Sequence, residues 1–301
     1  MEPYQPGKIP VLLVHGLLSS PATWAPLYND LQADPLLRER FQFWVYFYPT
    51  SDPYLATAVD LRHALAKLRD DLDPQHQDPA LDQMVLVGHS MGGLVSKLLS
   101  VDGGDDFWRL VSDEPIVQVK ATAEVREELD DTFYFRRQPG VRRVVFLGTP
   151  HRGSRLSPSL PARLALKFVR APKELLAEAN DVAAENPTLK LRQLPTSVDL
   201  LAPHAPALEV LAARSAPPGV HYHSIIGVAP LSRTLRIAEV LAGFGKPEPG
   251  DGVVPYSSAH LDSVDSELVV PAEHTEVHHH PLAVQEVRRI LLLHLQGEPA
   301  K

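Results

Sequence analysis

The chain has 301 residues, of which 44% are apolar, and carries a formal net charge of −8 with an isoelectric point near 5.9. This apolar content is ordinary for a globular protein with a sizeable core, and the acidic balance disfavours a nucleic-acid-binding protein. The absence of cysteine excludes disulfides, thiolate zinc sites and a cysteine nucleophile.

Short apolar segments rich in β-branched and aromatic residues alternate along the chain with segments of helical periodicity. Six strands are predicted, at 9–15, 41–48, 84–88, 144–148, 221–227 and 267–270. Helices are predicted over 20–33, over 55–72, from about 92 onward, and over 281–295. Strands that alternate with helices form a mostly parallel sheet covered on both faces, so we predict a single α/β domain over 1–301. No apolar run approaches the ~18 residues of a transmembrane helix.

Two segments fall outside this alternation. Residues 102–140 are charged and irregular, and residues 154–218 are rich in proline and predict several short helices. Segments inserted between core strands are where a cap over an active site is built. We therefore predict that both segments form a helical cap or lid within the domain.

A Gly-X-Ser-X-Gly motif, Gly88-His89-Ser90-Met91-Gly92, lies between the third predicted strand and the helix that follows it. A serine on such a tight turn is forced outward, and the glycines to either side let the backbones pass closely. Its hydroxyl then lies at a helix N-terminus, whose partial positive charge favours developing negative charge. The alternative is an incidental Gly-Ser turn, but the flanking strand and helix favour Ser90 as a nucleophile.

Four segments resemble bacterial lipases and esterases of the α/β-hydrolase superfamily, in family order. Residues 85–94 resemble the nucleophile elbow, 14–18 the oxyanion loop, 149–154 the Thr-Pro-His-X-Gly-Ser turn, and 250–255 the loop of the catalytic acid. Within the superfamily the chain is most similar to lipase-like proteins related to GPI inositol-deacylases. The resemblance implies an α/β-hydrolase fold with a serine, acid and histidine in that chain order.

An oxyanion hole is also implied, because acyl transfer places negative charge on the carbonyl oxygen of the substrate. Its donors would be the backbone N–H groups of Leu17, which follows His15-Gly16, and of Met91, which follows the nucleophile. The alternative for His15 and Gly16 is a plain strand-to-helix turn. Apolar residues near these loops could line an acyl pocket, although core packing is their default role. These candidate pocket residues are Leu17, Leu18, Trp24, Met91 and Val253.

The catalytic acid is expected after the strand at 221–227 and before the last strand. The carboxylates in this range are Glu239, Glu248, Asp251, Asp262 and Asp265. Asp251 is favoured because it is flanked by glycines and followed by Val-Val-Pro, as in the family. Such an acid holds the imidazole of the base in one tautomer and stabilises the imidazolium. The alternative for Asp251 is a surface Asp-Gly turn.

The base implied by the resemblance is His274, which follows the last strand and precedes the final helix. The family usually has glycine before this histidine, whereas this chain has Glu273, so His278 remains an alternative base. The run 278–280 could instead be a solvated polar loop or a helix N-terminus. Metal binding is a further alternative, since imidazole is a good ligand for zinc or nickel. However, the side chains of adjacent histidines point in different directions, and no group of carboxylates accompanies them in the sequence. We expect no metal and no cofactor.

The sequence therefore predicts a serine carboxylic ester hydrolase, of carboxylesterase or triacylglycerol lipase type, that forms an acyl-enzyme on a small-molecule, lipid or polyester ester. The same triad could serve a thioesterase, an amidase or an acyltransferase, and a catalytically silent member of the fold could bind a lipid or a partner. His89 and His151 are expected to be structural. No signal peptide is expected in the printed chain. It could be cytoplasmic, or secreted or membrane-attached with its leader removed, and the oligomeric state is open.

Overall fold

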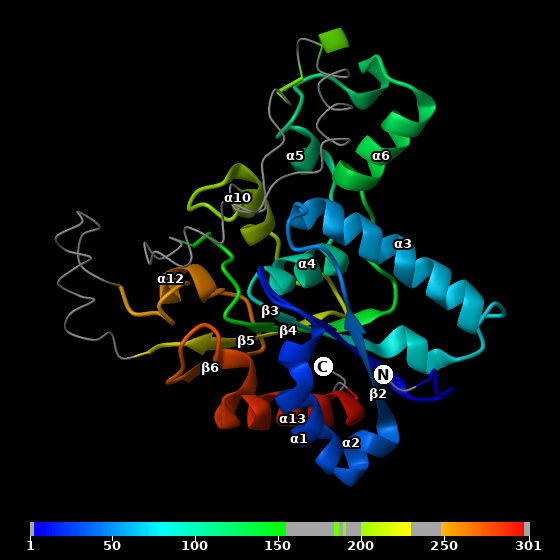
Figure 1. Ribbon diagram of the computed structural model, residues 1–301. Coiled ribbons are helices and arrows are strands. Elements are labelled where there is room, and N and C mark those ends of the chain that lie inside the picture. The colour runs from blue at the N-terminus through cyan, green and yellow to red at the C-terminus, as the bar shows by residue number, and fades with distance from the viewer. Residues whose placement is uncertain (1–2, 155–183, 187–188, 191–199, 230–247, 298–301) are drawn as a thin grey trace.

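The computed structural model describes residues 3–154, 184–186, 189–190, 200–229 and 248–297. A sheet of six strands lies at its centre in the order β2-β1-β3-β4-β5-β6 (Figure 1), and every neighbouring pair is parallel. This arrangement confirms the predicted α/β class. The strands are β1 (Ile9–Val14), β2 (Phe41–Tyr46), β3 (Met84–His89), β4 (Val141–Leu147), β5 (His221–Gly227) and β6 (Ser266–Val270).

Helices cover both faces of this sheet. In Figure 1, α3, α4, α5, α6 and α10 lie above the sheet, and α1, α2 and α13 lie below it. The α-helices are α1 (Ala25–Ala33), α2 (Pro35–Arg40), α3 (Tyr54–Leu72), α4 (Met91–Ser100), α5 (Asp105–Trp108), α6 (Ala123–Phe133), α10 (Pro206–Ala212), α12 (Tyr256–Ala259) and α13 (Pro281–Leu295). Short 3-10 helices are η1 (Pro21–Trp24), η2 (Pro79–Gln83), η3 (Ile116–Gln118) and η4 (Val277–His279).

The apolar core is divided by the sheet into two layers. Successive side chains of a strand point to opposite faces, so Leu12 and Val14 of β1 pack toward α3 and α4, whereas Val11 and Leu13 pack toward α1 and α13. Every residue of β1 is buried. This burial on both faces explains why β1 reads as a continuous apolar run rather than an alternating one.

Several elements differ from the sequence-based prediction, among them β2, which ends at Tyr46 rather than at 48. The helix predicted over 20–33 divides into η1 and α1. The short helix α2 was not predicted, although Asp34 caps it by accepting hydrogen bonds from the N–H groups of Leu36 at 2.9 Å and Leu37 at 3.4 Å. Strand β4 begins at Val141 rather than at 144, because the buried Arg143 interrupts the apolar run without ending the strand.

The segment 102–140 packs on the layer that contains α3 and α4. Phe107 and Trp108 of α5 are buried, and their rings meet Phe135 and Phe133 at centroid distances of 5.3 and 5.8 Å. The segment 154–218 lies largely outside the described residues, so a cap built from both segments stays a prediction. Within the part of the chain that the structure describes, no helix is long and apolar enough to cross a membrane.

Candidate active site

Ser90 occupies the sharp turn between β3 and α4. Its backbone has φ 54° and ψ −125°, in the left-handed half of conformational space that non-glycine residues rarely adopt. The Ser90 N–H donates to the carbonyl of Leu147 at 2.9 Å, which ties the turn to the end of β4. A Cβ at Gly88 would lie 2.5 Å from the carbonyl oxygen of Gly92, and a Cβ at Gly92 would lie 2.1 Å from that of Val14. Both glycines of the motif are therefore required by backbone contacts.

His274 lies in the turn after β6 and reaches Ser90 from a position 184 residues later in the chain. Its Nε2 is 2.9 Å from the Ser90 Oγ, and its Nδ1 is 2.7 Å from the Oδ2 of Asp251. The N–H of His274 also donates to the carbonyl of Asp251 at 2.9 Å. The imidazole is therefore oriented between a hydroxyl and a carboxylate, with one ring nitrogen toward each.

Asp251 is buried, with 2% of its surface exposed, and both of its carboxylate oxygens are engaged. Its Oδ1 accepts from the N–H groups of Val253 at 2.9 Å and Val254 at 2.7 Å, which leaves Oδ2 for the imidazole. Gly148, with φ +55°, lies beside this pair: a Cβ there would be 3.2 Å from Oδ2 of Asp251. Gly148 was not predicted from the sequence, where its only signal is its place directly before Thr149-Pro150.

The other carboxylates considered for this role lie elsewhere. Glu248 accepts from a backbone N–H in the α12 segment, Asp262 forms ion pairs with exposed side chains, and Asp265 accepts from a backbone N–H at the start of β5. Glu239 lies outside the described residues. Among the described candidates, Asp251 alone contacts His274.

The alternative base, His278, does not face the serine. Its Nε2 lies 2.7 Å from the Thr23 Oγ1, and its ring meets Trp24 edge-on at 5.6 Å. Burial, followed by the neighbouring His279, lowers the pKa of His278 to about 4. The structure thus brings His274, and not His278, to Ser90. Among the described residues, no group of three or more acidic or histidine side chains is arranged to hold a metal ion.

The segment 15–18 lies beside the nucleophile, as an oxyanion loop would. A Cβ at Gly16 would lie 2.8 Å from the Cβ of Ser90, so this backbone passes next to the serine. Met91 is the first residue of α4, and within the described part of the chain neither its N–H nor that of Leu17 donates to a backbone acceptor. Both N–H groups are therefore free to meet a negative oxygen.

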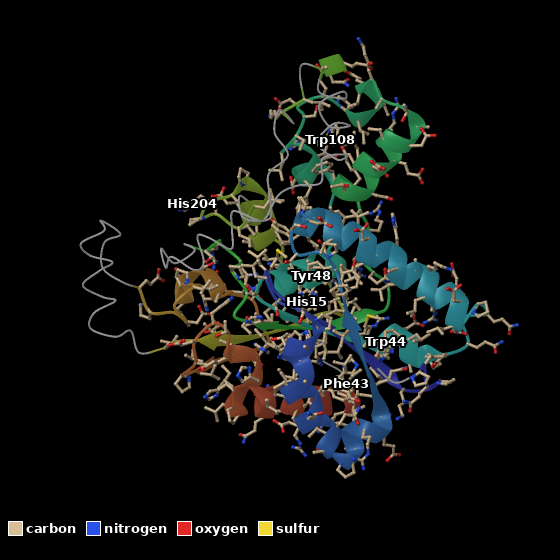
Figure 2. All side chains as sticks on the ribbon, viewed as in Figure 1. His15, Phe43, Trp44, Tyr48, Trp108 and His204 are labelled. Carbon is tan, nitrogen blue, oxygen red and sulfur yellow. The ribbon has the colours of Figure 1, made fainter. Side chains whose placement is uncertain are left out.

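Two residues that the sequence analysis missed shape this loop. The Tyr48 hydroxyl donates to the carbonyl of His15 at 2.5 Å, and the two rings stack with their centroids 4.4 Å apart. Figure 2 labels both residues, which follow β2 and β1. Thr50 accepts at its Oγ1 from the N–H of Leu18 at 3.2 Å. Tyr48 and Thr50 could not be predicted as contacts of this loop, because nothing in the sequence near them indicates that they reach the end of β1.

The candidate acyl-pocket residues have different environments. Leu18 is 55% exposed, with φ 56°, and Val253 is half-buried against the small cluster that contains Val254 and Ala259. Trp24 is 1% exposed and packs in the core layer beneath the sheet, so it is a core residue rather than a surface residue of the site.

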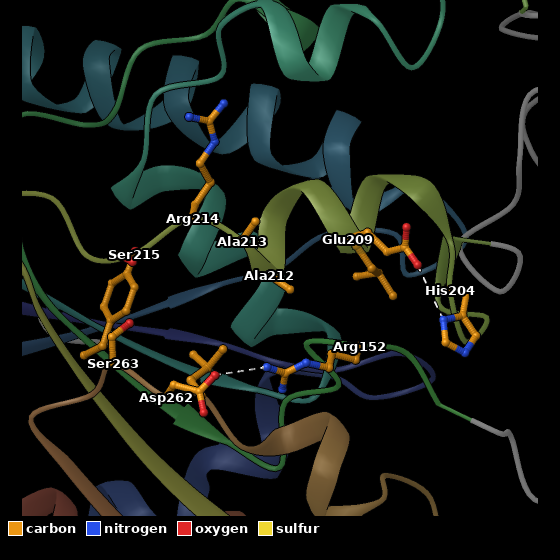
Figure 3. Close-up of a pocket in the computed structure, with 12 residues that line it drawn as sticks. Arg152, His204, Glu209, Ala212, Ala213, Arg214, Ser215, Asp262 and Ser263 are labelled. Atoms are coloured by element: carbon orange, nitrogen blue, oxygen red, sulfur yellow. Dashed lines mark ion pairs between the residues drawn. The ribbon is translucent and has the colours of Figure 1, made fainter.

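A separate pocket of about 580 Å³ lies between α10 and the segment before β6 (Figure 3). Two ion pairs, Arg152–Asp262 and His204–Glu209, lie along it. None of Ser90, Asp251 and His274 lines this pocket.

No protein-family model and no curated protein matches the sequence. The structure is similar to a lipase of Bacillus licheniformis, BlEst2 in mature form, with a TM-score of 0.54 and 17% identity over 97% of this chain and 95% of that one. It is also similar to the product of the gene lin2722 from Listeria innocua, with a TM-score of 0.51 and 14% identity over 98% of this chain and 96% of that one. Together with the parallel six-stranded sheet, these matches show that the chain has the α/β-hydrolase fold.

Proposed function

We propose that the protein is a serine carboxylic ester hydrolase in which Ser90 is the nucleophile, His274 the base and Asp251 the acid. The observation that carries the proposal is the continuous row of hydrogen bonds from the Ser90 hydroxyl through His274 to Asp251, with lengths of 2.9 and 2.7 Å. A nucleophile, a base within reach and a third group that orients the base are the parts that nucleophilic catalysis needs. The similarity to a Bacillus lipase supports the same class of substrate.

In the proposed reaction, the Ser90 Oγ attacks the ester carbonyl carbon while the His274 Nε2 takes its proton. The negative charge on the carbonyl oxygen is met by the N–H groups of Leu17 and Met91. The tetrahedral intermediate expels the alcohol, which takes the proton back from Nε2 and leaves an acyl group on Ser90. A water molecule then attacks the acyl carbon, again losing a proton to Nε2, and Ser90 leaves with that proton.

Asp251 accepts the hydrogen bond of the Nδ1–H, so that Nε2 is the free acceptor. Its second oxygen is bound by two backbone N–H groups, which fix the position of the carboxylate. The sequence of proton transfers needs no metal ion and no cofactor. We propose that the segments 102–140 and 154–218 cap this site within the single domain.

Hydrolysis of p-nitrophenyl esters of increasing acyl length tests the proposed function. We expect turnover by the native chain, with an optimum length that reports the acyl pocket, and a loss of ~10⁶ in kcat for Ser90→Ala, the size measured for removal of a triad nucleophile. Equal turnover by the native chain and Ser90→Ala, in preparations free of host esterases, would refute it. A native chain that hydrolyses thioesters or amides but no oxygen ester would retain the mechanism and change the substrate class.

A further inference from the structure

His89, the residue before the nucleophile, has a buried side chain that touches the loop of the proposed base. Its Nε2 lies 2.9 Å from the main-chain carbonyl oxygen of His274. A carbonyl oxygen can only accept a hydrogen bond, so Nε2 carries the proton and the ring is held in the Nε2–H tautomer. The contact joins residues 185 positions apart in the chain, and it links the end of β3 directly to the turn after β6.

The other side of the ring faces the loop that follows β1. A Cβ at Gly16 would lie 3.3 Å from the Nδ1 of His89, and within the described part of the chain this Nδ1 has no hydrogen-bond partner. One side chain therefore lies between the loop of the base and the proposed oxyanion loop, and its own backbone leads into Ser90.

The imidazole of His89 is surrounded by other rings. Its centroid lies 5.0 Å from that of His274 and 4.6 Å from that of His278. Burial, followed by the proximity of His274, lowers the pKa of His89 well below its ordinary value. The other titratable groups that act on it are His278 and His279. His89 therefore stays neutral, and adds no charge next to the imidazolium that His274 becomes during the proposed reaction.

We propose that His89 is a positioning residue, whose Nε2–H holds the backbone of His274 so that its imidazole is aimed at Ser90. This inference rests on the proposed function. The peptide groups around His274 are held from two sides, because its N–H donates to Asp251 and its carbonyl accepts from His89. Loss of the second bond leaves a carbonyl without its partner and lets the turn shift. Displacement of a catalytic group by ~1 Å can cost ~10²-fold in rate.

Two substitutions distinguish the contribution of the hydrogen-bond donor from that of the ring of His89. In His89→Gln, the side-chain amide nitrogen reaches about as far as Nε2 and keeps the donor, whereas His89→Phe keeps a planar ring and removes the donor. We expect His89→Phe to lower kcat for a p-nitrophenyl ester by ~10- to 100-fold with little change in KM, and His89→Gln to recover most of that loss. His151→Phe is the matched control. This histidine is also buried and packs on Phe146, but its side chain has no hydrogen bond to Ser90, His274 or Asp251.

A spectroscopic readout distinguishes positioning from general stability. The proton shared by His274 Nδ1 and Asp251 should give a far-downfield proton NMR signal in the native chain, in His89→Gln and in His151→Phe. We expect it to be shifted or broadened in His89→Phe at a temperature where the variant is folded. If His89→Phe does not fold, His89→Asn replaces it, because the shorter amide cannot reach the His274 carbonyl.

The outcomes for His89 and for the proposed function can be told apart. If Ser90→Ala abolishes hydrolysis but His89→Phe and His89→Asn keep native kcat and the native downfield signal, the positioning role is wrong and the proposed function stands. If His89→Gln is as slow as His89→Phe, the donor is not what matters, and the inference is also wrong. If Ser90→Ala hydrolyses normally, the proposed function itself fails.

Discussion

Asp251 is hydrogen-bonded through both carboxylate oxygens and through its backbone carbonyl. Its two oxygens accept from two backbone N–H groups and from His274, and its own backbone carbonyl makes a second link to that histidine. Asp251→Asn keeps the shape but presents either an N–H or a neutral oxygen to Nδ1, which favours the wrong tautomer of the imidazole. We expect a loss of ~10⁴ in kcat, as in serine proteases with the corresponding change. Near-native turnover of a folded Asp251→Asn would move the acid role to another carboxylate.

Single substitutions can also decide whether His274 or His278 is the base. His274→Ala should abolish ester hydrolysis, because no other described imidazole contacts Ser90. His278→Ala should retain the chemistry and lose stability, because it removes the contacts with Thr23 and Trp24. Activity and thermal unfolding of both variants, measured at equal folded concentration, check this. Loss of activity in His278→Ala alone would reverse the assignment.

The residues of the site were predictable from the sequence only where a local motif marks them. Ser90 and Asp251 stand in short glycine-flanked patterns, and the structure places both next to His274. The glutamate before His274 left the base open between two histidines, and only the three-dimensional contact separates them. Tyr48, Thr50 and His89 act across the fold on backbone groups, so no pattern in their own neighbourhood could reveal these contacts.

Helix α4 packs closely against the residue that follows β4, and Gly93 makes this contact possible. A Cβ at Gly93 would lie 1.9 Å from the Thr149 Oγ1 and 2.8 Å from its Cβ and Cγ2. Gly93→Ala should therefore force α4 away from the end of β4 and lower the thermal midpoint by several degrees, since overpacking costs ~1–3 kcal/mol. Thr149→Ala removes the nearest atom, so the double variant should recover part of the loss. Calorimetry of both single variants and the double variant checks this, and strictly additive losses would contradict the steric reason.

The predicted elements agree best where they are buried or strongly periodic. Strand β5 and helix α13 have the predicted bounds: every residue of the first except His221 is buried, and the second is amphipathic. Helix α2 was missed despite its Asp34-Pro35 start, since six residues offer too short a window for periodicity. The early start of β4 was missed because Arg143 reads as polar, although it is buried beside His223.

The stability of the whole molecule should depend on pH through basic side chains whose protonation is disfavoured in the folded chain. Burial, followed by Arg143, lowers the pKa of His223 to about 3 and that of His294 to about 4. Burial, followed by Arg152, lowers the pKa of Lys97 to about 7, and within the described part of the chain its Nζ has no hydrogen-bond partner. In each case the unfolded chain binds the proton more tightly than the folded chain does.

The direction in which stability changes with pH follows from that difference in proton affinity. The histidine contribution is complete above about pH 6.5 and is lost as the pH falls toward 4, whereas the Lys97 contribution is complete only near pH 10.5 and is lost as the pH falls to about 7. We therefore expect the thermal midpoint to rise between pH 7 and pH 9.5. Lys97→Met should raise the midpoint at pH 7 by at least ~3 °C and flatten that rise. Parallel pH curves for the native chain and Lys97→Met would contradict this reason.

The measurement that tests the account most directly is labelling of the native chain with a fluorophosphonate, followed by mapping of the adduct by mass spectrometry. A serine activated by His274 should react at its Oγ, so we predict an adduct on Ser90, its loss in Ser90→Ala, and much slower labelling of a folded His274→Ala. Labelling on a different serine, or an unreactive Ser90 in the folded native chain, would contradict the account.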